Sequence, residues 1–270
     1  MTPVVIIVLL SVTAVSPIPI SETDRKKRDV STTTFTKIAK ANENVLESHL
    51  RHGDIMVPTS NDDGILKNAV PCTSAGCKWP KTRRRVKIPY TISNEFSRKQ
   101  KRTIRRALRA FKRGKRRTCI RFVRKRRRHR DYISFISGTG CWSYLGRQGN
   151  AQQISLQKNG CVFKDIVQHE ALHALGFHHE HVRSDRDEHV IINFENIISG
   201  TEHNFDKEET NNLGSPYDFN SIMHYNNFAF SKNQRPTIVA KSNPNLLFGL
   251  AREMSSNDIA RVNALYGCDK

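Results

Sequence analysis

The sequence predicts one α+β domain of two lobes over residues 68–270. Three observations lead to this fold class. Short segments with alternating apolar residues, together with one helical pattern, fill the first half of the region. Mostly irregular chain follows a dense histidine cluster, and no internal repeat is apparent. The chain has 270 residues, which is enough for one sizeable core or two small ones.

The chain begins with the apolar run MTPVVIIVLLSVTAVS. This run is too short to span a bilayer, and no second apolar stretch of that kind follows. It is typical of a secretory signal peptide, here residues 1–16. We therefore expect a secreted, extracellular protein with no membrane span, for which storage in secretory granules is a natural route. A buried hydrophobic strand is the alternative interpretation.

Residues 17–67 are polar and poor in aromatic side chains, and no cysteine precedes Cys72. They contain the basic run Arg25–Arg28, of the kind that processing proteases cut. We interpret the segment as a propeptide that an activating protease removes by cleavage at Lys67-Asn68, leaving 68–270 as the mature domain. A flexible tail without a regulatory role is the alternative.

The first regular elements of the mature domain are a strand and a helix. Every second residue over 86–92 is apolar, which predicts a strand, and Pro89 indicates an edge or irregular position in it. A capping box over 97–100 begins a helix that ends by Gly114 and carries its arginines opposite an apolar face. Three short strands follow, around Ile120/Phe122, Ile133/Phe135 and Ile154/Leu156.

Two further helices are predicted, one on each side of the irregular region. The first runs over about 164–175, with Gly176 as its C-terminal stop. The last helix starts at a second capping box over 255–258, buries apolar residues at helical spacing and ends before Gly267.

The formal net charge of +20 is concentrated in one segment. Residues 81–130 carry 24 lysines and arginines but a single acid, Glu95. Such a block is typical of disorder or of a polyanion-binding arm. Apolar residues recur inside it at structural spacing, so we expect a folded segment with a basic outer face that contacts an acidic matrix or glycan.

The six cysteines form an even set, which is consistent with an oxidising destination and three disulfides. Cys72 and Cys77 are close enough in sequence to form a local loop. The sequence alone leaves the other pairings open.

The stretch HEALHALGFHHEH, residues 169–181, holds five of the eleven histidines. His169 and His173 lie one helical turn apart on one face, so both imidazoles can reach one ion. Gly176 allows the chain to turn back, which brings His179 to the same ion as a third ligand. This set predicts one zinc ion per chain, with Glu170 placed to take a proton from a water molecule. We assign His178 and His181 to surface or supporting positions.

The extended pattern His169-Glu-x-x-His-x-x-Gly-Phe-x-His-Glu-x-x-Arg183-x-Asp-Arg-Asp187 resembles the signature of the astacin family of metzincin zinc endopeptidases. Downstream, Ser221-Ile-Met-His-Tyr225 resembles the Met-turn of that family. The resemblance covers essentially all of 68–270. It implies a two-lobed protease domain, with a mixed sheet and two long helices in the N-terminal lobe and a mostly irregular C-terminal lobe that ends in a helix.

The resemblance also implies roles for single residues. Tyr225 would be a further zinc ligand that swings away to hydrogen-bond the developing oxyanion, and Met223 would form the apolar base beneath the zinc. Glu180 would receive the amine of Asn68 after activation. Gly53-Asp54 resembles the aspartate switch, in which the carboxylate binds zinc in the zymogen, although Arg51 stands where the family has an aromatic residue. An ordinary Gly-Asp turn is the alternative.

The family pattern implies the disulfides Cys119–Cys268 and Cys141–Cys161. The additional pair Cys72–Cys77 resembles the six-cysteine group that includes fish hatching enzymes. This likeness implies a monomeric protease that acts on an extracellular protein substrate, the egg envelope at hatching.

Three other functions remain open. One is a six-cysteine astacin of adult epithelial or brood tissue with another protein substrate. Another is a secreted basic module that binds sulfated glycans or nucleic acid, although no nucleic-acid motif with base-stacking aromatics accompanies the cations. The third is a proteolytically inactive homologue, which the complete set of zinc-site residues disfavours.

Overall fold

The computed structural model describes residues 32–45, 49–57, 77–112 and 118–268. Four short 3-10 helices lie between residues 180 and 205: η2 (Glu180–Val182), η3 (Arg186–Glu188), η4 (Phe194–Asn196) and η5 (Glu202–Phe205). The other elements, in chain order, are α2 (Thr34–Asn42), β1 (Leu50–Arg51), β2 (Ile55–Met56), β3 (Lys81–Thr82), β4 (Arg85–Ile92), α3 (Arg98–Ala110), β5 (Ile120–Arg124), β6 (Tyr132–Ile136), β7 (Cys141–Ser143), β8 (Ala151–Leu156), α4 (Lys164–Ala174), β9 (Val190–Ile192), β10 (Ile238–Ala240) and α5 (Ser256–Tyr266).

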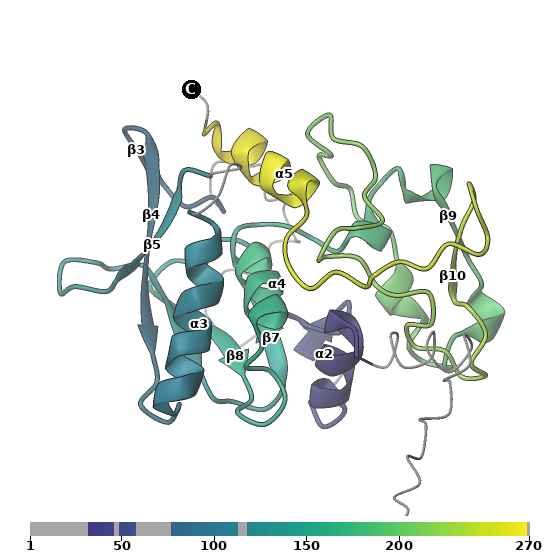
Figure 1. Ribbon diagram of the computed structural model, residues 1–270, viewed down its shortest axis with the longest axis horizontal. Helices are drawn as coiled ribbons and strands as arrows, with labels where there is room; N and C mark the ends of the chain where they lie inside the picture. Colours follow the sequence, from purple (N-terminus) through teal and green to yellow (C-terminus); the bar gives the residue numbers. More distant parts are fainter. Residues whose placement is uncertain (1–31, 46–48, 58–76, 113–117, 269–270) are drawn as a thin grey trace, which may run out of the picture.

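The chain forms two lobes of different character. One contains the main sheet with α3 and α4, and the other is mostly irregular chain that carries β9 and β10 (Figure 1). The helix α5 follows the irregular lobe and ends near the strands of the first lobe (Figure 1). The predicted α+β class, with its mixed sheet, two long helices and terminal helix, is confirmed.

The main sheet has the strand order β1-β2-β7-β8-β6-β4-β3, with β5 paired to β4. It is mixed, because β4 pairs in parallel with β5 and β6 whereas β7 pairs antiparallel with β8. A strand with partners on both sides lies inside the sheet, and the interior strands β4, β6 and β8 supply fully buried isoleucines. This order places β7 and β3 toward opposite ends of the sheet.

The strand β4 is not an edge strand, but Pro89 has a sheet partner on one side only, so the predicted edge or irregular position holds locally. The strand β4 has partners on both sides, and Pro89 lies opposite Val123 of β5. The backbone N–H of Val86 points to β5, where it bonds the carbonyl of Cys119, so by alternation the nitrogen of Pro89 faces the other side. Pairing with β6 begins only at Tyr90, so no backbone hydrogen bond is lost through the missing N–H of Pro89.

The helices α3 and α4 contact each other and share one core with the sheet (Figure 1). As predicted, α3 begins at the capping box of Ser97 and Gln100 and buries Ile104, Ala107 and Leu108. The helix α4 is buried along its whole length after Lys164. Side chains on α4 therefore lie inside the molecule, where a polar group needs a partner.

The irregular lobe has its own core, in which aromatic side chains gather around Tyr225. The terminal helix α5 is held by its predicted caps: Ser255 closes a capping box with Asp258, and Gly267 ends the helix at φ 55°. Asp258 is buried and also accepts hydrogen bonds from the hydroxyl of Ser221 (2.6 Å) and the amide of Ile222 (3.1 Å). One side chain thus ties α5 to the segment beneath the histidines.

The predicted propeptide contributes regular structure that no sequence pattern indicated. The helix α2 starts at the side-chain cap of Thr33 and buries Phe35 and Ile38, each in one of the two cores. The strands β1 and β2 form a hairpin, and β2 pairs in parallel with β7. The Asn42 side chain bonds both the N–H (2.7 Å) and the C=O (2.8 Å) of Cys141. The segment is therefore docked along the strand β7.

Two disulfides close the described part of the chain, Cys119–Cys268 and Cys141–Cys161, the two pairings that the resemblance implies. The predicted signal peptide, the cleavage position Lys67-Asn68 and Cys72 lie outside the described residues. Among the helices of the described ranges, none has the length and apolar character needed to cross a membrane.

Candidate active site

Three of the five clustered histidines point their Nε2 atoms at one place. His169 and His173 come from α4, and His179 follows the turn after this helix. The Nε2 atom of His169 lies 3.1 Å from that of His173 and 3.2 Å from that of His179. Ligand atoms of a tetrahedral zinc ion lie about 3.3 Å apart when each Zn–N bond is ~2.0–2.1 Å. The spacing of the three nitrogens therefore fits zinc.

Backbone carbonyls hold two of the rings in the orientation that a metal requires. His169 donates through Nδ1 to the carbonyl of Ile222 (2.9 Å), and His173 donates through Nδ1 to the carbonyl of Phe177 (2.7 Å). These bonds leave the Nε2 atoms as lone-pair donors. Lone pairs that face each other inside a buried site repel unless a cation lies between them, so the donor set itself favours a bound metal.

Asp54 of the β1–β2 segment completes this cluster. Its carboxylate oxygens lie 3.0 Å from Nε2 of His169, 3.3 Å from that of His173 and 3.2 Å from that of His179. The side chain is 1 % exposed. Burial alone would raise the pKa of Asp54, but the close imidazoles of His179, His173 and His169 hold it well below its usual range. The ionised carboxylate is thus a fourth ligand candidate.

Glu170 is fully buried next to the first histidine, and neither of its carboxylate oxygens has a hydrogen-bond partner among the described residues. Burial, and then the negative charge of Asp54, raises the pKa of Glu170 well above its ordinary value. A carboxyl group with such a pKa, beside a metal site and without a partner, is suited to accept and return a proton.

Gly176 and Met223 help to position the chain around the third histidine. Gly176 has φ 101°, a conformation that favours glycine, and the chain turns there so that His179 comes back to α4. Met223 is buried in the main core, and its carbonyl accepts a hydrogen bond from the amide of Glu180 (2.9 Å). The turn that contains Met223 therefore fixes the chain directly after the third histidine.

Tyr225 is fully buried beside this turn, and its ring centroid lies 4.8 Å from that of His179. Its hydroxyl donates a hydrogen bond to the carbonyl of His52, at 2.5 Å. In this structure the hydroxyl is thus bound to the backbone of the β1–β2 hairpin. Burial, and then Asp54, raises the pKa of Tyr225 well above its usual value, so the phenol keeps its proton.

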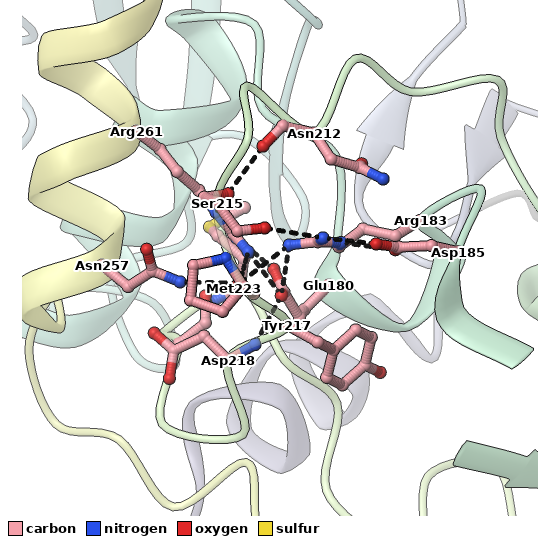
Figure 2. A network of polar contacts seen from close by, with 12 residues as sticks. Glu180, Arg183, Asp185, Asn212, Ser215, Tyr217, Asp218, Met223, Asn257 and Arg261 are labelled. Atoms are coloured by element: carbon pink, nitrogen blue, oxygen red, sulfur yellow. Dashed lines mark hydrogen bonds and ion pairs between the residues drawn. The ribbon is translucent and has the colours of Figure 1, made fainter. Parts of the chain in front are cut away.

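Glu180 is 1 % exposed, so it is not a surface residue. Arg261 of α5 reaches both of its oxygens, Arg183 lies 3.1 Å away, and the amide of Asp218 donates at 2.8 Å. Figure 2 shows this network between α5 and the loops around residues 183 and 215. Asn68, the expected partner of Glu180, lies outside the described residues.

The two remaining histidines of the cluster differ from each other. His181 is fully buried, its ring stacks on that of Tyr225 at 3.7 Å, and its Nε2 bonds the carbonyl of Asn204 (3.0 Å). It is a supporting residue, and a surface position is excluded. His178 is half-buried and lies near His52 and Glu208, two residues that no sequence pattern singled out.

Known proteins resemble the chain in both sequence and structure. Residues 74–267 match the peptidase family described as Astacin. High choriolytic enzyme 1 of Oryzias latipes is 47 % identical over 86 % of this chain and 83 % of its own length. The low choriolytic enzyme of the same fish is 45 % identical over 89 % of this chain and 84 % of its own length.

The solved structure of high choriolytic enzyme 1, described as a hatching enzyme zinc-protease from medaka, superposes with a TM-score of 0.70 at 50 % identity. It covers 74 % of this chain and all of the solved chain. Matching family, relatives and fold accompany a zinc-compatible triad of histidines with an adjacent buried glutamate. The chain is therefore a zinc metalloendopeptidase and belongs to the astacin family.

Proposed function

We propose that this peptidase is secreted as a latent zymogen, in which Asp54 closes the metal site until residues 17–67 are removed. The observation that carries the proposal is the distance of 3.0–3.3 Å from the Asp54 carboxylate to all three Nε2 atoms. A carboxylate in that position fills the place that a reacting water molecule needs. The Asn42 side chain and β2 support it by docking the same segment on β7.

His169, His173 and His179 would hold one zinc ion, which when bound polarises the scissile carbonyl and lowers the pKa of a water molecule. After Asp54 departs, Glu170 takes a proton from the attacking water and returns it to the leaving amine. The Tyr225 hydroxyl, released from the carbonyl of His52, donates a hydrogen bond to the oxyanion.

Activation by cleavage at Lys67-Asn68 frees a new amine for Glu180. A pocket lined by Glu180, Arg183 and Leu213, among other residues, opens beside the carboxylate. Arg261 and Arg183 already neutralise Glu180, so the amine adds to an existing network instead of pairing with an isolated charge. The amine of the mature N-terminus then forms hydrogen bonds in this network and orders the neighbouring loops. These bonds require the Glu180 carboxylate to stay in its position.

The substrate that we propose is an egg-envelope protein, degraded at hatching. The identity to two choriolytic enzymes of medaka, over most of both chains, supports this assignment. A protein substrate of adult epithelial or brood tissue is the second candidate. Expression confined to hatching-gland cells favours the envelope, and expression in adult epithelia favours the second candidate.

A basic surface on the main lobe would hold the enzyme on an acidic matrix or glycan. Exposed cations lie on the outer face of α3, on the β3–β4 turn and on the β5–β6 loop: Arg98, Lys99, Arg102, Arg105, Arg106, Arg109, Arg83, Arg84, Arg85, Arg126, Arg127 and Arg128. These elements are at the β3 end of the sheet, whereas β7 and the docked hairpin are at the other end. A polyanion bound there leaves the metal site open.

The substitution Glu170→Gln in the activated protein tests the catalytic assignment. We expect peptide hydrolysis to fall by about 10²- to 10⁴-fold, since the proton acceptor is lost. The zinc content should remain near one per mature chain, because Glu170 is not a ligand. The matched control is Glu188→Gln, an exposed glutamate, which should keep full activity. Near-normal turnover of the Glu170 variant, or cleavage that persists after chelation, would refute the proposal.

A further inference from the structure

A second group of metal-binding side chains lies beside the catalytic histidines. It consists of His52 from the β1–β2 hairpin, His178 from the histidine segment and Glu208 from the loop after η5. Each offers one ligand atom, and the three atoms lie within 4.8 Å of one another. None of the three belongs to the zinc site described above.

The histidine nitrogens of this group lack the hydrogen bonds that burial demands. His52 is 0 % exposed, and within the described ranges neither of its ring nitrogens, nor Nδ1 of His178, has a hydrogen-bond partner. The Nε2 atom of His52 approaches Glu208 at 3.4 Å without hydrogen-bond geometry. A buried polar atom without a partner costs roughly 1–3 kcal/mol. A metal ion between these side chains would satisfy one nitrogen of each imidazole.

One ligand pair of the group has the spacing of a tetrahedral ion, and the whole group is compact. The separation of 3.4 Å between His52 and Glu208 is close to the ~3.3 Å expected of two ligands on one zinc ion. His178 lies on the wall of the pocket beside Glu180, from which a metal and a fourth ligand water can enter. Two imidazoles and one carboxylate are a ligand set that zinc takes.

Glu208 already pairs with a cation, so a positive charge beside its carboxylate stabilises the ionised form. The guanidinium of Arg51 lies 2.6 Å from Oε1 of Glu208, whose side chain is 10 % exposed. The Arg51 side chain itself is 41 % exposed, so it can turn into solvent. A divalent ion held by two imidazoles can replace it and neutralise the same carboxylate from inside.

We propose that His52, His178 and Glu208 form a second zinc site, which exists only while the propeptide is docked. It rests on the proposed latency, because His52 lies in the hairpin that cleavage removes. The other two ligands belong to the catalytic domain, so zinc at this site links the propeptide to the enzyme. By linkage, free zinc at about 100 times the dissociation constant favours the docked state about 100-fold.

The experiment measures the zinc content of the full-length zymogen that carries Glu170→Gln, which prevents self-cleavage. After equilibrium dialysis against zinc we expect two ions per chain. His178→Gln and Glu208→Gln, each added singly, should lower this to one, and the retained ion reports that the protein is folded. The matched control is Glu209→Gln, the exposed neighbour of Glu208, which should keep two ions.

A kinetic readout accompanies the stoichiometry. Rising zinc should slow release of the cleaved propeptide by at least tenfold in the otherwise unchanged zymogen, but not in the His178→Gln variant. One zinc ion per zymogen chain with unchanged release would overturn the second site while leaving the catalytic site intact. A zymogen without any zinc would instead overturn the proposed function.

Discussion

Asp54 reaches its three imidazoles across a long stretch of sequence, since 115 residues separate it from His169. Its neighbour Gly53 has φ 76°, which gives the hairpin the sharp turn that aims the carboxylate inward. The side chain of Asn42 bonds the carbonyl of Gly53 (2.7 Å) and secures the turn. The proposed inhibitory position of Asp54 thus depends on a few polar contacts at single residues.

Replacement of Asp54 by alanine should abolish latency in the uncleaved chain. The carboxylate is the only propeptide group that the described residues place within 3.3 Å of the three Nε2 atoms, so a water molecule could take its place. Hydrolysis of a small peptide by the intact zymogen measures the effect. The exposed residue Glu43 offers the control Glu43→Ala, which should stay latent. Full latency of the Asp54 variant would mean that another group blocks the site.

Tyr225→Phe removes one hydroxyl from the proposed oxyanion site. We expect kcat to fall by about 10²- to 10³-fold with a much smaller change in KM, because the bond forms in the transition state. Steady-state kinetics of the activated enzyme check this, alongside the zinc content. Tyr132→Phe, on the distant strand β6, is the control. Equal activities for both variants would leave Tyr225 only a packing role against His181.

At the scale of elements, local sequence patterns predicted the structure well where a cap or a regular period marks it. The capping boxes at Ser97 and Ser255 and the glycine after α5 begin and end their helices as expected. The strands β1, β2 and β7 escaped notice because two or three residues are too short to show a period. The helix α2 was not predicted because the polar residues around it in the sequence hide the helical spacing of its apolar residues.

The partners within the site were harder to predict for a different reason. The motif predicted the three histidines and Glu170, because these residues are close together in the sequence, on one helix and the turn that follows it. Arg261, however, lies 81 residues from Glu180, and no local pattern indicates that it pairs with this glutamate. Contacts of that kind depend on how the elements assemble, which sequence periodicity does not encode.

The ion pair between α5 and η2 supports a prediction for stability. Arg261→Met should lower the free energy of unfolding by about 3–5 kcal/mol, since it leaves the Glu180 carboxylate buried without its bidentate partner. Urea denaturation of the zymogen provides the measurement. Arg235→Gln, an exposed arginine of the same lobe, should change it little. A loss below about 1 kcal/mol for Arg261→Met would show that Arg183 alone compensates Glu180.

At the scale of the whole molecule, positive charge and catalysis occupy opposite ends of one sheet. The imidazole of His129 reports this local field: burial, followed by Arg128, Arg126 and Lys125, lowers its pKa below the ordinary value. Charges that are exposed to solvent act over about 8 Å at physiological salt, so only a surface in near contact experiences them. The basic face is therefore suited to docking on a matrix at short range.

The variant Arg102→Glu/Arg105→Glu/Arg109→Glu reverses three charges on the exposed face of α3. Binding to acidic matrix should weaken by at least tenfold and lose its dependence on salt, whereas hydrolysis of a small neutral peptide should not change. Cosedimentation with the matrix at several salt concentrations measures binding. The matched control reverses three cations of the other lobe, Lys232, Arg235 and Lys241. Equal loss in both variants would indicate a general effect of net charge.

The parallel pairing of β2 with β7 has a consequence for what the mature enzyme can digest. Under the proposed activation the hairpin leaves, and the rim of β7 that it covered exposes backbone amide and carbonyl groups beside α4, the helix of His169 and His173. An extended polypeptide can add itself there as a new strand, held by main-chain bonds that are the same for every amino acid. Unfolded or fibrous chains of many compositions should then be threaded and cut, whereas tightly coiled helices should be spared.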